Sequence, residues 1–220
     1  MSTRPATRSG RGLQEPPVNP EPPPAPASTD HLLWQGTGPT QQGFLGLAHE
    51  SRVQSAYCPA LISGALQTPD YARAVLRSVV DLHQLPDDVE EGVAARAARA
   101  ALLGADSRTH HVLLGEQALL TAVAGPAVMR AQLRHLLHLL EMPALTVAVI
   151  PARARLRVYP GDSFTIYDGT RVETEGYAGP RTITAPDRVA TFQRAFDLLR
   201  DSAQRAPTAR EAIAAALRGV

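Results

Sequence analysis

A run of prolines near the N-terminus constrains this chain more than any other feature of its sequence. More than half of the residues between Glu15 and Pro26 are proline. Proline has no amide hydrogen and a fixed φ, so this segment cannot join a helix or a sheet. We therefore expect residues 1–42 to form a disordered tail and residues 43–220 to form the folded domain. A docking segment for a proline-recognising domain is the alternative interpretation of the tail.

The composition limits where the protein works and what it binds. The chain has 220 residues and a net charge of +1, and all of its basic residues are arginine, so no field would steer it to a polyanion. Cys58 is the single cysteine, which excludes an internal disulfide and a cysteine-based metal site. No apolar run is long enough to span a bilayer, and the N-terminus does not resemble a secretory signal. We expect a cytoplasmic protein that does not bind a membrane.

Several helix starts carry chemical markers. Thr68 followed by Pro69 predicts an N-cap and a first helical position. Asp87 with Glu90 matches a capping box, and the helix after it should run to Leu103. The interior of that helix is largely alanine, so we expect another element to approach it closely. Further helices are expected from Pro126, Pro186 and Thr208.

Strand patterns follow in the second half of the chain. Residues 145–150 are an apolar run stopped by proline, which predicts a strand buried on both faces. Residues 163–167 and 171–175 alternate around a glycine turn and predict a β-hairpin, and residues 111–114 predict another short strand. This order predicts an α+β fold, with a helical N-terminal part followed by a small, mostly antiparallel sheet covered by helices.

The segment from Tyr57 to Arg73 carries a family resemblance. It is similar to a Pro-Gly-Leu-Leu-Gln-Thr-Pro-x-Tyr-Ala signature, although Ser63 replaces the proline, Ala65 replaces a leucine and Cys58 replaces a usual glutamate. The signature belongs to the C-terminal domain of unknown function (DUF5753) of actinobacterial antitoxin-like helix-turn-helix transcriptional regulators. The matching positions are Glu50, Tyr57, Gly64, Leu66, Gln67, Thr68, Pro69, Tyr71 and Ala72.

Later segments extend the resemblance over residues 43 to 200. Arg96 and Arg99 resemble the family's Arg-x-x-Arg helix. Glu116 resembles the glutamate of its Asp-Glu-x-x-Leu motif, with Gly115 in place of the aspartate. The other matches are Met129, Gln132 and Leu133 in one helix, residues 146–151 in a strand, and Phe164 and Glu173 in the last strands.

The resemblance implies a regulatory binding role. Residues 1–42 are too short and too rich in proline for a helix-turn-helix, so we do not expect direct binding of nucleic acid. Members of the family are thought to pair with small proteins encoded nearby. We therefore expect a small partner protein, or a DNA-binding protein that acts in trans, with a small-molecule ligand or a homo-oligomer left open.

Two carboxylates suggest where such binding would occur. Glu116 and Glu173 fall within or at the end of apolar strands, where a carboxylate needs a partner. Arg96 and Arg99, on one helix face, are the candidate partners. A structural ion pair is one interpretation. The other is the polar lining of a ligand pocket or partner interface, to which Gln67, Tyr71 and Gln132 would also belong.

No constellation of residues specifies a reaction. His135, His138 and Glu141 could share a helix face, but a metal site would need a further ligand that the sequence does not supply. Cys58 is more typical of a small buried residue than of a nucleophile. No phosphate-binding glycine loop is present, so we expect no cofactor. The alternative function is a cofactor-independent cyclase or isomerase of a specialised-metabolite biosynthetic pathway, recruited from this fold.

Overall fold

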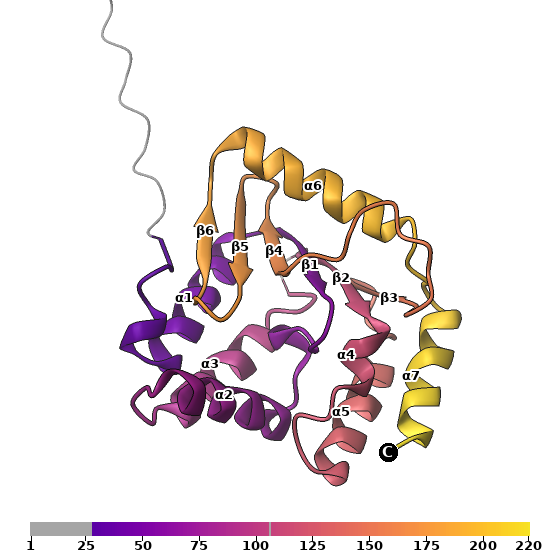
Figure 1. The fold of residues 1–220 in the computed structure, drawn as a ribbon, viewed down its shortest axis with the longest axis horizontal. Helices are drawn as coiled ribbons and strands as arrows, with labels where there is room; N and C mark the ends of the chain where they lie inside the picture. The colour runs from indigo at the N-terminus through magenta and orange to yellow at the C-terminus, as the bar shows by residue number, and fades with distance from the viewer. Residues whose placement is uncertain (1–27, 106) are drawn as a thin grey trace, which may run out of the picture.

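The computed structural model describes residues 28–105 and 107–220, and a mixed sheet forms its centre. The six strands lie in the order β3-β2-β1-β4-β5-β6 (Figure 1). β1 (Val53–Cys58), β2 (Thr109–Gly115) and β3 (Leu145–Ile150) are parallel neighbours. β4 (Ser163–Tyr167), β5 (Arg171–Glu175) and β6 (Arg181–Ile183) continue the sheet with antiparallel pairings. The predicted α+β class is confirmed.

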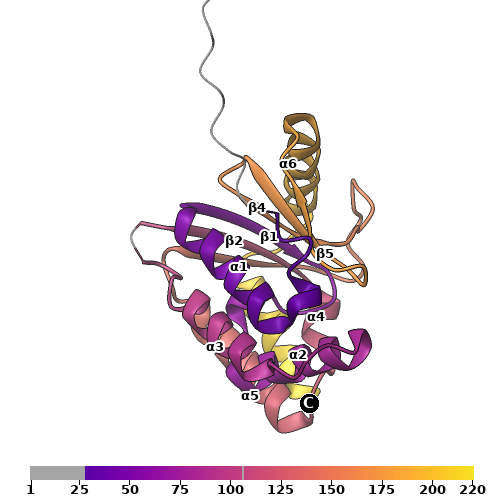
Figure 2. The same cartoon turned by 90° about the vertical axis from the view of Figure 1, so that its left-hand side faces the viewer.

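Helices cover both faces of this sheet. The helix α6 (Pro186–Arg200) lies along one face, and α1, α2, α3 and α5 lie on the opposite side (Figure 2). These four helices span Thr37–Glu50, Pro69–His83, Val89–Ala100 and Pro126–Leu139. Two more helices, α4 (Glu116–Leu120) and α7 (Thr208–Arg218), pack with α5 into the same core. No helix within the described ranges is long and apolar enough to cross a membrane.

The alternation of side chains along the strands separates two cores. Ala56 and Val112 are neighbours on β1 and β2, and both pack in the core that contains α2, α5 and α7. Tyr57 and Leu113, one residue further on, pack against α6 instead. Because successive strand residues point to opposite faces, each strand supplies both cores. Residues 145–150 and the hairpin strands occupy the predicted ranges, whereas β2 is longer than the predicted residues 111–114.

The start of α2 matches the prediction and the start of α3 does not. The Thr68 hydroxyl accepts a hydrogen bond from the amide of Tyr71 at 3.5 Å, so Thr68 is the predicted N-cap. The predicted capping box of Asp87 and Glu90 is wrong, because these carboxylates pair with arginines of α2. Helix α3 begins at Val89 and ends at Ala100, before the predicted Leu103.

Asp88 instead caps a helix that is distant in the sequence. Its carboxylate accepts hydrogen bonds from the amides of Thr37 and Gly38 at 2.9 and 2.8 Å, and from the Thr37 hydroxyl at 2.7 Å. These amides lie at the N-terminus of α1, where backbone donors have no partner within the helix. The alanine-rich helix α3 also approaches α1 as expected. A Cβ atom at Gly92 would lie 3.1 Å from the Thr37 hydroxyl.

The folded part of the chain begins earlier than predicted. A 3-10 turn at Leu33–Gln35 and the start of α1 lie ahead of the expected boundary at residue 42, and Thr29 and Leu33 are buried. Thr29 and Leu33 come shortly after the proline run, within the residues predicted to form the same tail. The run itself lies outside the described residues. The strands β1 and β6 and the short helix α4 were also absent from the sequence-based expectation.

Candidate ligand-binding site

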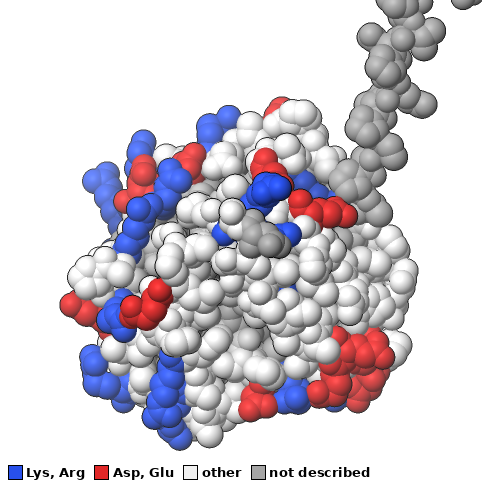
Figure 3. Space-filling view, turned by 180° about the vertical axis from the view of Figure 1, so that it is seen from behind, with Lys and Arg blue, Asp and Glu red and all other residues white. Residues whose placement is uncertain are grey.

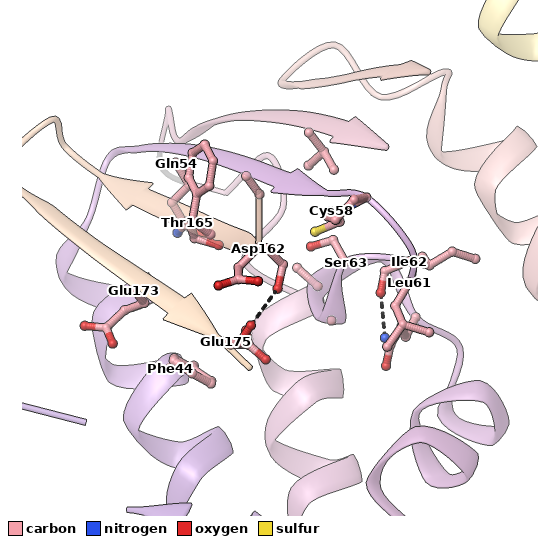
Figure 4. Close-up of a pocket in the computed structure, with 18 of the residues that line it drawn as sticks. Phe44, Gln54, Cys58, Leu61, Ile62, Ser63, Asp162, Thr165, Glu173 and Glu175 are labelled. Carbon is pink, nitrogen blue, oxygen red and sulfur yellow. Dashed lines mark hydrogen bonds between the residues drawn. The ribbon is translucent and has the colours of Figure 1, made fainter. Parts of the chain in front are cut away.

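A cavity of about 480 Å³ lies between the sheet and the helices α1 and α3. The strands β1, β2, β4 and β5 form one wall, and the loop formed by residues 59–63, which follows β1, contributes to its lining. Figure 4 shows Gln54 and Cys58 on β1, Thr165 on β4 and Glu175 on β5 around this space, with Phe44 of α1 below them. The volume is in the range of pockets that bind small organic molecules.

The sheet wall is a lattice of alternate strand residues. Gln54 of β1 is in register with His110 of β2 on one side and with Tyr167 of β4 on the other. Residues opposite one another share a face, so these three polar side chains form a row. The next row along the sheet is Val112, Ala56, Thr165 and Glu173.

The helical wall supplies two guanidinium groups, both from α3. Arg96 donates from Nε to Oε1 of Gln41 at 3.0 Å and from Nη1 to the side-chain oxygen of Gln67. Gln67 in turn donates to the carbonyl of Ile62 at 2.7 Å. The Arg99 guanidinium lies 5.5 Å from the centre of the Phe44 ring, a cation–π arrangement.

Neither arginine has a carboxylate partner among the described residues. The ion pairs found there do not include Arg96 or Arg99. Arg96 is only 7% exposed, and burial, with the nearby Arg99 charge second, lowers its pKa to about 10. The Glu175 carboxylate acts in the opposite direction. The Arg96 guanidinium is therefore charged at neutral pH, and Arg99 places a second guanidinium group in the same part of the cavity wall.

Two buried side-chain nitrogens of the sheet wall have no protein partner. They are Nε2 of Gln54, a residue 7% exposed, and Nε2 of His110, a residue 4% exposed. Burial lowers the pKa of His110, so the ring is neutral at pH 7. The carbonyl of Leu102 accepts a hydrogen bond from the ring. We assign the proton to Nδ1, which leaves Nε2 as an acceptor.

Cys58 is not suited to nucleophilic attack at neutral pH. Burial is the main cause that raises the pKa of its thiol to about 12, and the Glu175 carboxylate adds to it. The thiolate, which is the reactive form, is therefore almost absent at pH 7. Cys58 serves the cavity as a small, neutral wall residue.

Glu173 connects the cavity wall to the first described residues. Its carboxylate accepts a hydrogen bond from Nε of Arg171 at 2.6 Å and from the hydroxyl of Thr182 at 3.0 Å. The hydroxyl of Thr29 also donates to it, and the amide of Thr182 donates to Asp30 at 2.6 Å. The expected pairing of Glu173 with the α3 arginines is therefore wrong.

The predicted site residues divide into those that line the cavity and those that do not. Gln67, Arg96, Arg99 and Glu173 all line the cavity. Tyr71 is fully buried in the core, and Gln132 bridges the turn before α2, accepting from the Thr68 amide at 2.7 Å and donating to the Leu66 carbonyl at 2.8 Å. Glu116 lies at the far end of β2, where its partner is the amide of Ala152 at 2.7 Å.

Two glycines allow close approaches around the cavity. A Cβ atom at Gly64 would overlap Nη2 of Arg99, so the guanidinium occupies the space that a side chain would fill. A Cβ atom at Gly115 would overlap the carbonyl oxygen of Pro59. The first glycine sets the position of a charged group, and the second lets the loop of residues 59–63 lie against the end of β2.

Most of the folded region corresponds to a known sequence family. The family model described as "Domain of unknown function (DUF5753)" matches residues 41–215. The chain belongs to the DUF5753 family. A search of curated proteins finds no match to it.

Some cavity residues of this DUF5753 domain were not expected from the sequence. They are Phe44, Gln54, His110, Tyr167 and Glu175. The available signal was the spacing of Gln54, Ala56 and Cys58, which share one face once residues 53–58 are identified as a strand.

A metal site is not formed by the helix residues that suggested one. Glu141 accepts a hydrogen bond from Arg210 of α7. Among the described residues of this DUF5753 domain, no three histidine, cysteine or acidic side chains are grouped as they would be around a metal ion.

Proposed function

We propose that this DUF5753 domain is a regulatory binding domain that takes a small organic ligand into the cavity between the sheet and α3. The unpartnered polar atoms of Gln54 and His110, buried in the wall of a cavity of about 480 Å³, carry the proposal. A buried polar atom without a partner costs about 1–3 kcal/mol. A ligand that offers these atoms hydrogen-bond partners recovers that cost, so the two atoms favour binding.

The connection to the N-terminal segment supports a regulatory role. Glu173 lines the cavity and also accepts the hydrogen bond from Thr29. A ligand that shifts the Glu173 carboxylate would change how residues 28–30 are held against β6. Binding would then be transmitted to a small partner protein or to a DNA-binding protein in trans. This is a coupling of two sites through one shared side chain.

The surface supports a protein partner over nucleic acid. Acidic and basic side chains are interspersed on the face in Figure 3, and neither sign forms a continuous patch across it. The net charge of +1 gives no general attraction to a polyanion.

One observation favours catalysis as a second candidate. His110 presents a neutral, unpartnered Nε2 in a cavity that also contains the Arg99 guanidinium. Such a pair could accept a proton and stabilise a developing negative charge. The corresponding activity is a cofactor-independent cyclisation or isomerisation.

Native mass spectrometry of the full chain tests the binding function. The protein is incubated with a small-molecule extract of the cells that make it. The bound compound is then released, and its mass is measured. We expect an adduct with the wild type and a matching rise in Tm, and neither with Thr165→Trp, which fills the cavity. Thr146→Trp on β3 outside the cavity lining is the matched control.

The outcomes separate the candidates. A compound recovered unchanged after long incubation supports regulation, and its conversion to an isomer supports catalysis. Equal adduct formation by wild type and Thr165→Trp, or no adduct with either, would refute binding in this cavity.

A further inference from the structure

We propose that the cavity is built for a small organic monocarboxylate. Its carboxylate would pair with Arg96 and Arg99, and a hydroxyl or amide at its other end would bond Gln54 and His110. This inference rests on the proposed function and specifies the chemical class of the ligand.

The cavity wall contains two guanidinium groups, and no carboxylate among the described residues pairs with either. Arg96 and Arg99 contribute two positive charges, whereas Glu173 is neutralised by Arg171 at 2.6 Å. Glu175 is close enough to act on Arg96 but is not within ion-pair distance. The exposed Glu175 and Asp162 carboxylates also line the cavity, but no ion pair among the described residues joins either of them to Arg96 or Arg99. A buried charge without a partner is costly, and one anion removes that cost.

The two guanidiniums are prepared for a planar anion. The bonds to Gln41 and Gln67 fix Arg96 through neutral oxygens, so its charge stays available. Arg99 lies over the Phe44 ring, and its Nε, buried, has no hydrogen-bond partner. Ring stacking leaves the edge of a guanidinium free, and that edge matches a carboxylate through paired N–H donors.

The sheet wall of the cavity offers one donor and one acceptor. Gln54 Nε2 donates and His110 Nε2 accepts, and the two residues are in register on neighbouring strands. A hydroxyl or an amide satisfies both atoms at once, since each contains a donor and an acceptor. Ala56, Val112 and Leu103 line the space with apolar surface. The complementary molecule is therefore an acid with an apolar middle and a polar, uncharged end.

A phosphate monoester fits this wall less well. It carries close to two negative charges at neutral pH, and the Glu175 and Asp162 carboxylates, which also line the cavity, repel a dianion more than a monoanion. Glu175 thus acts as a selectivity residue, lowering affinity for every anion and most of all for dianions.

Matched probes test both ends of the proposed ligand. Isothermal titration of the full chain would use 4-hydroxyphenyl-alkanoic acids of increasing chain length, their primary amides and their methyl ethers, together with phenyl phosphate. We expect at least one acid to bind about 10- to 100-fold more tightly than its amide, because charge-assisted hydrogen bonds are stronger than neutral ones. The methyl ether, which cannot donate to His110, should also bind more weakly.

Variants then assign the effects to residues. Arg99→Gln should remove the preference for the acid, with little change for the amide. Gly64→Ala should act in the same direction, because its Cβ displaces the Arg99 guanidinium. Glu175→Gln should tighten binding of the acid several-fold, since a repelling charge is lost. Arg188→Gln, on the exposed side of α6, is the control and should change nothing.

Three results would overturn the monocarboxylate assignment. They are amides that bind as tightly as the acids, phenyl phosphate that binds more tightly than every acid, or no binding by any acid. If the extract still yields a cavity adduct in those cases, the binding function stands and only the ligand class is wrong. If no adduct forms either, both proposals fail.

Discussion

Replacing Gln132 by methionine tests how the turn before α2 is held. Gln132 is completely buried, and its amide bridges the Thr68 amide at 2.7 Å and the Leu66 carbonyl at 2.8 Å. Methionine has similar length but offers neither bond, so it leaves one donor and one acceptor without partners. Each costs about 1–3 kcal/mol, and after the gain from apolar burial we expect a loss of about 3 kcal/mol in the free energy of unfolding.

Urea unfolding and calorimetry measure this loss. For a domain of this size, about 3 kcal/mol corresponds to a fall in Tm of about 6–12 °C. The urea m-value should stay unchanged, because the surface exposed on unfolding is the same. Gln42→Met is the control, because Gln42 is exposed on the helix α1. This substitution should change the free energy of unfolding by less than about 0.5 kcal/mol. Equal stability of the two variants would refute the argument that these two bonds hold the turn.

Three further predictions concern capping, the thiol and pH. Asp88→Ala should destabilise the fold by about 1–2 kcal/mol in urea titrations through loss of the α1 cap, and Asp88→Asn, which keeps an acceptor, by less. Cys58 should react slowly with a disulfide reagent at pH 8 in the native protein and fast in urea, because its pKa is near 12; rapid native labelling would contradict this. His110 has a folded pKa below its unfolded value, so stability present above about pH 6.5 should be lost as pH falls. His110→Gln should flatten that dependence of the urea midpoint, and an unchanged slope would exclude this histidine as the cause.

Elements with local chemical markers could be predicted from the sequence. Thr68 and Pro69 are adjacent and together mark the start of α2. The hairpin of β4 and β5 is marked by alternating polar and apolar residues on both sides of a glycine turn. The cap on α1 could not be predicted, because Asp88 is far from Thr37 in the sequence. Nothing local distinguishes an aspartate that caps its own helix from one that caps another.

The strand β1 was missed because it forms part of the site. It is central in the sheet, yet Gln54 and Ser55 are both buried, so its polar and apolar residues do not alternate. The polar residues of β1, of which Gln54 lines the cavity, therefore hid the pattern of a buried strand. The pairing of Glu173 could have been found, since Arg171 lies two residues away on the same face of one strand.

The contact between Gly115 and the carbonyl of Pro59 has a consequence for comparing members of this family. Any larger residue at position 115 would push the loop of residues 59–63 outward, and Leu61 and Ile62 would travel with it. The width of the cavity thus depends on residue 115 at the end of β2, although this residue does not line the cavity. Two proteins with the same lining residues could therefore bind ligands of different size. Gly115→Ala would be a direct way to enlarge the cavity of this protein.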